Sequence, residues 1–129
     1  METILVADDE AQVRSLARDI LQGAGYCVLE AEDGEQALRV AENHQGAIHV
    51  LLTDIMMPGI NGKELAGRFI VLRPDAKAIF MSGRVAEVIS NAGGLIPADA
   101  FLAKPFTAER LLSKVRERIE HCSPFSRPA

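Results

Sequence analysis

The sequence contains only two cysteines, Cys27 and Cys122, and its three histidines show no metal-ligand spacing with each other or with the cysteines. A His/Cys metal centre is therefore not indicated, and we interpret the cysteines as reduced thiols of a cytoplasmic protein. No apolar run approaches the roughly 18 residues of a membrane span. The N-terminal stretch METILVADDE has no basic segment before an apolar one, so we expect no secretory signal.

Neither sign of charge dominates: the chain has 14 Lys and Arg against 18 Asp and Glu, which gives a net charge of −4. This mild acidity argues against direct electrostatic binding to nucleic acid or to an anionic membrane. A length of 129 residues suits one domain with one core. We expect a domain over residues 1–121 and a flexible tail over residues 122–129, where no periodicity is present.

Short apolar runs alternate with helical patterns along the whole chain. The runs predict strands at residues 3–7, 26–31, 48–53, 76–82 and 100–103. Helical spacing follows each run, with Asp33, Asn61 and Thr107 as expected N-caps, and a fourth, poorly defined helix is expected over residues 84–91. Five such units in succession predict an α/β fold in which helices cover both faces of a parallel sheet.

Polar side chains follow four of these runs at the carboxyl end of each predicted strand: Asp8, Asp9, Asp54, Ser82 and Lys104. The working crevice of an open parallel sheet lies at that edge, so we expect these groups to meet there. Three carboxylates that crowd together repel one another, and oxygen ligands favour Mg²⁺, which would relieve the repulsion. The second strand offers Glu30, which we interpret as a surface residue.

This set of groups predicts chemistry on phosphorus. With a metal ion and Lys104 nearby, Asp54 can stay ionised and attack a phosphorus atom to form an acyl phosphate. The lysine, the metal and the Ser82 hydroxyl would then hold the phosphoryl oxygens and stabilise charge in the transition state.

Four stretches carry a family resemblance: ILVADDE (4–10), LLTDIMMPGINGKEL (51–65), AIFMSG (78–83) and AFLAKPF (100–106). Over roughly residues 2–120 the chain resembles the receiver domain of two-component response regulators. The resemblance implies a flavodoxin-like fold with a five-stranded parallel sheet in the order 2-1-3-4-5. It also implies a phosphoryl donor, either a histidine kinase or a histidine phosphotransfer domain, and a monomer or weak homodimer.

The resemblance implies roles for individual residues. Asp54 is the expected phosphoacceptor, Asp9 a direct Mg²⁺ ligand, and Asp8 a ligand that acts partly through water. The backbone carbonyl of Met56 is the further expected metal ligand. Ser82 and Lys104 stand at the positions of the hydroxyl and lysine that catalyse transfer in such domains.

Three further expectations come from the same resemblance. The peptide bond before Pro105 is cis in such domains. A switch couples Ser82 to the aromatic residue three positions before the lysine, here Phe101, whose ring lacks the hydroxyl of the commoner tyrosine. Met56 and Arg84 flank the expected path of attacking water, and we therefore expect slow self-hydrolysis of the phosphorylated form.

The residues of the matching stretches are most similar to those of receivers fused to the C-terminus of hybrid sensor histidine kinases. A stand-alone regulator, a trimmed transcription factor, and a degenerate receiver used only for protein interaction stay open as alternatives. A haloacid-dehalogenase-like phosphatase would need a second Asp where Met56 stands. A nucleotide-binding module would need a glycine-rich turn between strand and helix, and the sequence has none.

Overall fold

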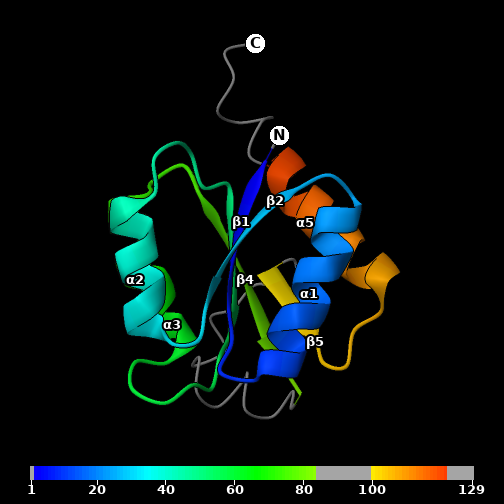
Figure 1. Ribbon diagram of the computed structural model, residues 1–129, viewed down its shortest axis with the longest axis horizontal. Coiled ribbons are helices and arrows are strands. Elements are labelled where there is room, and N and C mark those ends of the chain that lie inside the picture. Colours follow the sequence, from blue (N-terminus) through cyan, green and yellow to red (C-terminus); the bar gives the residue numbers. More distant parts are fainter. Residues whose placement is uncertain (1, 84–99, 122–129) are drawn as a thin grey trace.

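The computed structural model describes residues 2–83 and 100–121, and there strands and helices alternate as predicted. The helix expected over residues 84–91, Arg84 with it, and the tail over residues 122–129 with Cys122 lie outside the described residues. The elements are β1 (Thr3–Ala7), α1 (Ala11–Gly23), β2 (Cys27–Ala31), α2 (Gly34–Asn43), β3 (Val50–Asp54), α3 (Gly62–Leu72), β4 (Lys77–Ser82), β5 (Phe101–Ala103) and α5 (Ala108–His121) (Figure 1).

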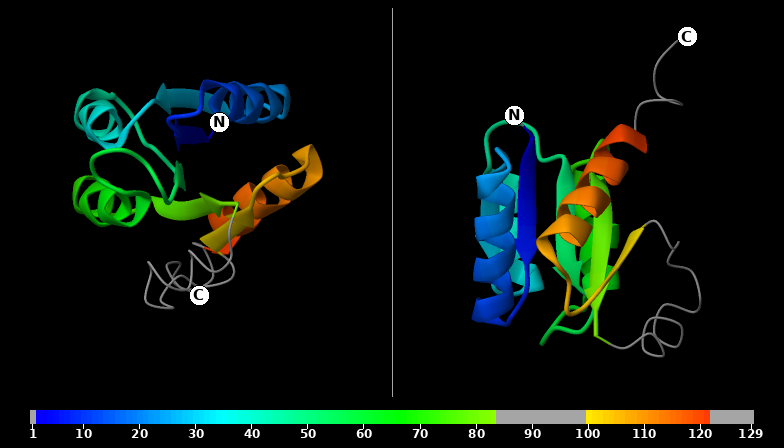
Figure 2. Two further views of the ribbon diagram at one scale, coloured as in Figure 1. Left: turned by 90° about the horizontal axis from the view of Figure 1, so that it is seen from below. Right: turned by 90° about the vertical axis from the view of Figure 1, so that its right-hand side faces the viewer.

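All five strands run parallel in the order β2-β1-β3-β4-β5, which confirms the flavodoxin-like arrangement expected from the sequence. Helices α1 and α5 cover one face of the sheet, and α2 and α3 cover the other (Figure 2). Because both faces are covered, the central strands carry near-continuous apolar runs rather than an alternating pattern.

Successive side chains of each strand enter opposite halves of the core, as the pleat of a strand requires. On β1, Ile4 and Val6 pack in the cluster that contains Leu111 of α5. Leu5 points to the other face, where Phe69 of α3 is fully buried. Two apolar layers therefore clamp the sheet and make its strands rigid supports for the residues at their carboxyl ends.

The three predicted N-caps are confirmed. Each cap side chain accepts a hydrogen bond from the backbone N–H three residues later, which satisfies one of the unpaired donors of a helix start. The pairs are Asp33 with Gln36 at 2.8 Å, Asn61 with Glu64 at 2.8 Å and Thr107 with Arg110 at 3.1 Å.

Strand β3 begins at Val50, two residues later than predicted, and continues to Asp54. The imidazole of His49 explains the late start, because its Nδ1 accepts a hydrogen bond from the Thr3 N–H at 3.0 Å. The His49 N–H in turn donates to the Thr3 carbonyl at 2.8 Å. A side chain thus replaces one backbone partner of the ladder at this end of the sheet.

Gly62, the first residue of α3, leaves no room for a side chain. A β-carbon built at this position would overlap the backbone carbonyl of Asp54, whereas one at Gly67 of the same helix would meet nothing within 4 Å. We expect Gly62→Ala to lower the free energy of unfolding by about 2 kcal/mol, because backbone must move to admit the methyl group. Urea unfolding measures this change.

Gly67→Ala is the matched control in the same helix. It should raise the free energy of unfolding by up to about 1 kcal/mol, because alanine is the better helix former. Equal stability of the Gly62→Ala protein and the unmodified protein would show that α3 can shift away from Asp54 without cost.

Candidate functional site

Four of the predicted site residues meet at the carboxyl edge of the sheet. Asp8 follows β1, Asp54 ends β3, Ser82 ends β4 and Lys104 follows β5. The register places Asp54 beside Met81, the residue before Ser82, and the Lys104 N–H donates to the Ser82 carbonyl at 2.9 Å. The strand order therefore brings together groups that lie 96 positions apart in the sequence.

The Lys104 ammonium is the positive charge of this site. Its Nζ lies 2.9 Å from Oδ2 of Asp8, 3.3 Å from Oδ2 of Asp54 and 3.4 Å from Oε1 of Glu10. Asp8 is fully buried and Asp54 is nearly so. One cation thus faces three anions, and around the two buried aspartates, where most water is excluded, the charges interact strongly; Glu10 is exposed.

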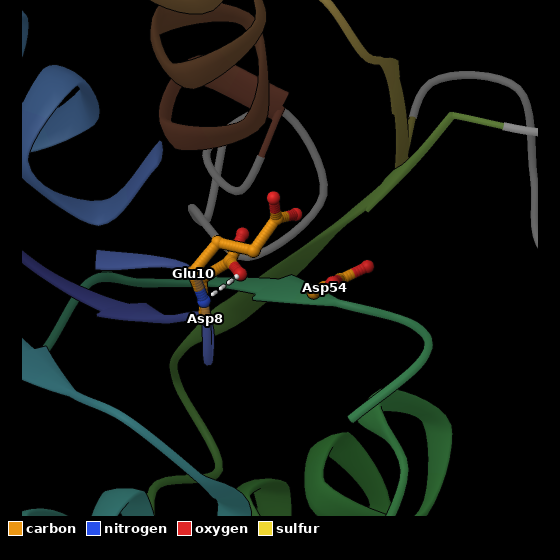
Figure 3. Close-up of side chains that lie close together, drawn as sticks. All are labelled: Asp8, Glu10 and Asp54. Carbon is orange, nitrogen blue, oxygen red and sulfur yellow. Dashed lines mark hydrogen bonds between the residues drawn. The ribbon is translucent and has the colours of Figure 1, made fainter. Parts of the chain in front are cut away.

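Oxygen atoms of Asp8, Glu10 and Asp54 lie within 4.8 Å of one another (Figure 3). The Glu10 N–H also donates to Oδ1 of Asp8 at 2.9 Å, which fixes the turn after β1. Carboxylate oxygens are the ligands that a hard cation such as Mg²⁺ prefers, and this set offers them. Sequence reasoning missed Glu10, although its signal was present as the third acid of the run Asp8–Glu10.

Asp9 lies on the other side of the same turn. Its side chain is exposed and lines a cavity of about 420 Å³ together with residues of the α2 start and of the loop before α3, namely Glu32, Asp33, Glu35, Pro58, Gly59 and Ile60. The structure therefore groups Glu10, rather than Asp9, with the two buried aspartates. The role of Asp9 as a direct metal ligand stays a prediction.

The structure also describes Met56, Phe101 and Pro105 among the predicted residues, and it gives the burial of Ser82. The Met56 N–H lies 3.4 Å from Oδ1 of Asp54, and the Met56 side chain is half exposed. Ser82 is buried, and Phe101 lies beside Phe80 in the β4–β5 ladder. The Lys104–Pro105 peptide bond is cis.

The electrostatics of the site follow from burial and charge together. Burial is the largest influence on Asp54 and raises the pKa of its carboxyl above the ordinary value. The charge of Asp8 acts in the same direction, whereas Lys104 and the Met56 amide offset part of the rise. Burial disfavours the Lys104 ammonium, but the hydrogen bond and charge of Asp8 and the charge of Asp54 outweigh it, so the pKa of Lys104 is raised.

Comparison with known proteins agrees with this geometry. Residues 4–116 match the profile of the family described as "Response regulator receiver domain". The chain belongs to the response regulator receiver domain family. It is 36% identical over 121 residues to the sensor kinase CckA of Brucella abortus, a match that covers 92% of this chain and 12% of the kinase. The chain spans about half the length of other curated relatives, which are transcriptional or response regulators.

Solved receiver domains share the fold. The crystal structure of the receiver domain from the hybrid histidine kinase CckA has a TM-score of 0.75 and 37% identity, and the match covers 91% of this chain and 98% of that one. A CheY-like receiver from Methanospirillum hungatei JF-1 has a TM-score of 0.79 and 30% identity, with coverage of 95% and 96%. As a receiver domain, the chain is a signalling module of two-component systems.

None of the helices in residues 2–83 and 100–121 combines the length and hydropathy that a membrane span requires.

The raised pKa of Asp54 predicts a stability gain when its charge is removed. The folded state holds the Asp54 proton more tightly than the unfolded state, so stability is lost as pH rises from 3.8 through the folded pKa. In metal-free buffer at about pH 7.5, we expect Asp54→Asn to raise the free energy of unfolding by on the order of 1 kcal/mol. The gain should shrink toward about pH 4, where the unmodified carboxyl becomes protonated.

Urea unfolding at both pH values measures the effect, and Asp19→Asn is the control because Asp19 forms an exposed pair with Arg18. A stability loss for Asp54→Asn at the higher pH would show that the Lys104 pair, and not burial, dominates the energy of this carboxylate.

Proposed function

We propose that this receiver domain accepts a phosphoryl group from phosphohistidine onto Asp54. The observation that carries the proposal is the nearly buried Asp54 carboxylate, which lies at the end of β3 beside Asp8 and 3.3 Å from the Lys104 ammonium. A carboxylate that is held rigid and partly desolvated, with a cation beside it, is suited to attack an electrophilic phosphorus.

The residues of this chain divide the work of transfer. An Oδ atom of Asp54 forms the new bond to phosphorus as the P–N bond of the donor breaks, and the departing imidazole keeps the bonding electrons and takes up a proton. Lys104 pairs with a phosphoryl oxygen, and the Ser82 hydroxyl donates to another. Water attack on the same phosphorus returns Asp54 to its free form.

The carboxylates of Asp8, Asp9 and Asp54 and the carbonyl of Met56 are the proposed holders of Mg²⁺. When bound, Mg²⁺ would neutralise charge on the phosphoryl oxygens. Glu10 contributes acidity to the same pocket but is more exposed than Asp8, and it contacts Lys104 only at 3.4 Å.

Phosphorylation is proposed to act through Ser82 and Phe101. The Lys104 N–H binds the Ser82 carbonyl, and Phe101 lies three residues before that lysine on β5. A shift of Ser82 as its hydroxyl moves toward a phosphoryl oxygen would thus be transmitted through this hydrogen bond to β5, the strand that carries the ring. Phenylalanine makes this coupling one of packing rather than of hydrogen bonding.

A hybrid sensor histidine kinase is the proposed parent of the domain, supported by the likeness to the kinase CckA and to its receiver. A cytoplasmic location, a histidine kinase or phosphotransfer partner and a monomeric or weakly dimeric state belong to the same proposal. A stand-alone regulator is the second candidate, supported by the CheY-like receivers of similar fold. The length of the native open reading frame separates the two.

Acetyl phosphate with Mg²⁺ tests the chemistry directly. We expect one added phosphoryl group of about 80 Da on the peptide that contains Asp54. Asp54→Asn should abolish labelling, and Lys104→Met should slow it by about 100-fold or more, because a charge that stabilises the transition state is lost. Intact-protein and peptide mass spectrometry measure both.

An unmodified protein that binds Mg²⁺ and is never labelled would support the degenerate receiver instead. Lys63→Met, which removes an exposed lysine at the start of α3, is the charge-matched control and should label normally.

The two acids that follow Asp8 can be separated by a second experiment. We expect Asp9→Asn to weaken Mg²⁺ binding by about tenfold or more, because a carboxylate in direct contact with the metal is lost. Glu10→Gln should weaken Mg²⁺ binding by about threefold at most, because the entropy cost of ordering an exposed, flexible side chain offsets most of what its carboxylate adds to the affinity. The rise in melting temperature with added Mg²⁺ reports both affinities. A larger loss of Mg²⁺ affinity in Glu10→Gln than in Asp9→Asn would assign the metal to the cluster of Asp8, Glu10 and Asp54.

A further inference from the structure

Two charged side chains connect the candidate site to the edge strand β2. Nη1 of Arg14, on α1, donates to the backbone carbonyl of Asp8 at 2.7 Å. Nε of the same guanidinium lies 3.4 Å from Oε1 of Glu30, on β2. The Arg14 side chain is 17% exposed, and its contacts therefore lie largely within the protein. Glu30 is thus a bonded residue rather than the plain surface residue expected from the sequence.

These contacts act on the turn that presents Asp8. The turn begins where β1 ends at Ala7, and α1 begins at Ala11. The Asp8 N–H donates to the Ala31 carbonyl at 3.1 Å, while Arg14 holds the Asp8 carbonyl. Both backbone groups of Asp8 are therefore tied toward β2, one directly and one through the arginine that Glu30 orients.

The side chain of Asp8 binds groups outside β2. Its Oδ2 binds the Lys104 ammonium at 2.9 Å, and its Oδ1 accepts from the Glu10 N–H. A carboxylate that binds a small cation needs a fixed backbone, because the position of the backbone sets where the ligand oxygens lie. Partners behind the direct ligands commonly control metal affinity for this reason.

We propose that Arg14 is a positioning residue for cation binding at the phosphoacceptor site, and that Glu30 orients it. The inference rests on the proposed function, since it assigns a metal role to the Asp8 turn. Glu30 also balances the guanidinium charge, so that the arginine holds the turn without adding an uncompensated positive charge next to a cation site.

Arg18 supplies a matched control on the same helix. Its Nη1 lies 3.3 Å from Oε2 of Glu30, so it shares the carboxylate that Arg14 uses. It stands one helical turn further from Asp8 and also pairs with Asp19 at 3.1 Å. Removal of Arg18 tests the loss of a cation from the Glu30 pair without loss of the bond to the Asp8 carbonyl.

The experiment compares the unmodified protein with Arg14→Met, Arg14→Lys, Glu30→Gln and Arg18→Met. Mg²⁺ affinity is measured without phosphodonor from the Mg²⁺-dependent shift in melting temperature. We expect Arg14→Met to raise the Kd for Mg²⁺ by about tenfold, and Arg14→Lys to recover part of the loss, because the ammonium can still donate to the Asp8 carbonyl. Glu30→Gln should raise the Kd by about threefold or more, and Arg18→Met should leave it within about twofold.

The labelling rate with acetyl phosphate separates positioning from general damage. At saturating Mg²⁺ the Arg14→Met rate should approach that of the unmodified protein, whereas at low Mg²⁺ it should fall with occupancy. An unchanged Kd in Arg14→Met overturns the proposal. So does a rate that stays equally depressed at all Mg²⁺ concentrations, or a loss in Arg18→Met as large as in Arg14→Met.

These outcomes are distinct from failure of the proposed function. Unmodified protein that binds Mg²⁺ without being labelled at Asp54 overturns the phosphoacceptor assignment, and the Kd series still decides the role of Arg14. Unmodified protein whose melting temperature does not respond to Mg²⁺ overturns the Arg14 proposal.

Discussion

The contact of one ammonium group, that of Lys104, with three carboxylates is the interaction on which the site depends. Asp8 is fully buried, and a buried carboxylate without a partner is strongly destabilising. Its partner comes from the far end of the chain and arrives only when β5 has joined the sheet beside β4. Formation of the site and completion of the sheet are therefore energetically linked, because the carboxylates gain their counter-charge only in the finished fold.

One lysine does not neutralise the negative charge of this site. Burial keeps the pKa of Asp54 raised despite the ammonium 3.3 Å away, and the charge of Asp8 adds to the effect. An acyl phosphate on Asp54 would carry about two negative charges in place of the one on the carboxylate, so the site would become more negative by about one charge. A second source of positive charge is thus a physical requirement of aspartyl phosphate chemistry here. A divalent cation at the proposed metal site would supply it.

The sequence predicted the parts of the molecule that follow periodic rules. Continuous apolar runs located the strands, cap residues such as Asp33 and Asn61 located helix starts, and the parallel order then located Asp54 and Lys104 at one edge. Turns obey no such period. Whether Asp9 or Glu10 joins Asp8 depends on the backbone path after β1, and the bond from Arg14 to the Asp8 carbonyl leaves no trace in spacing. The shortened start of β3 likewise rests on one side chain, His49.

The turn after β1 is held from both edges of the sheet at once. Ala31 of the edge strand β2 binds its backbone, and Lys104, which follows the opposite edge strand β5, binds its carboxylate. A displacement of β5 would therefore change the charge environment of Asp8, and a change at Asp8 would pull on Lys104 and the strand that carries Phe101. Such reciprocity is what linkage would require of the proposed switch, in which phosphorylation and the position of an edge strand influence each other. The partners of Asp8 come from β2, from α1 with its N-cap Glu10, and from the segment after β5, so three separate parts of the fold fix its position.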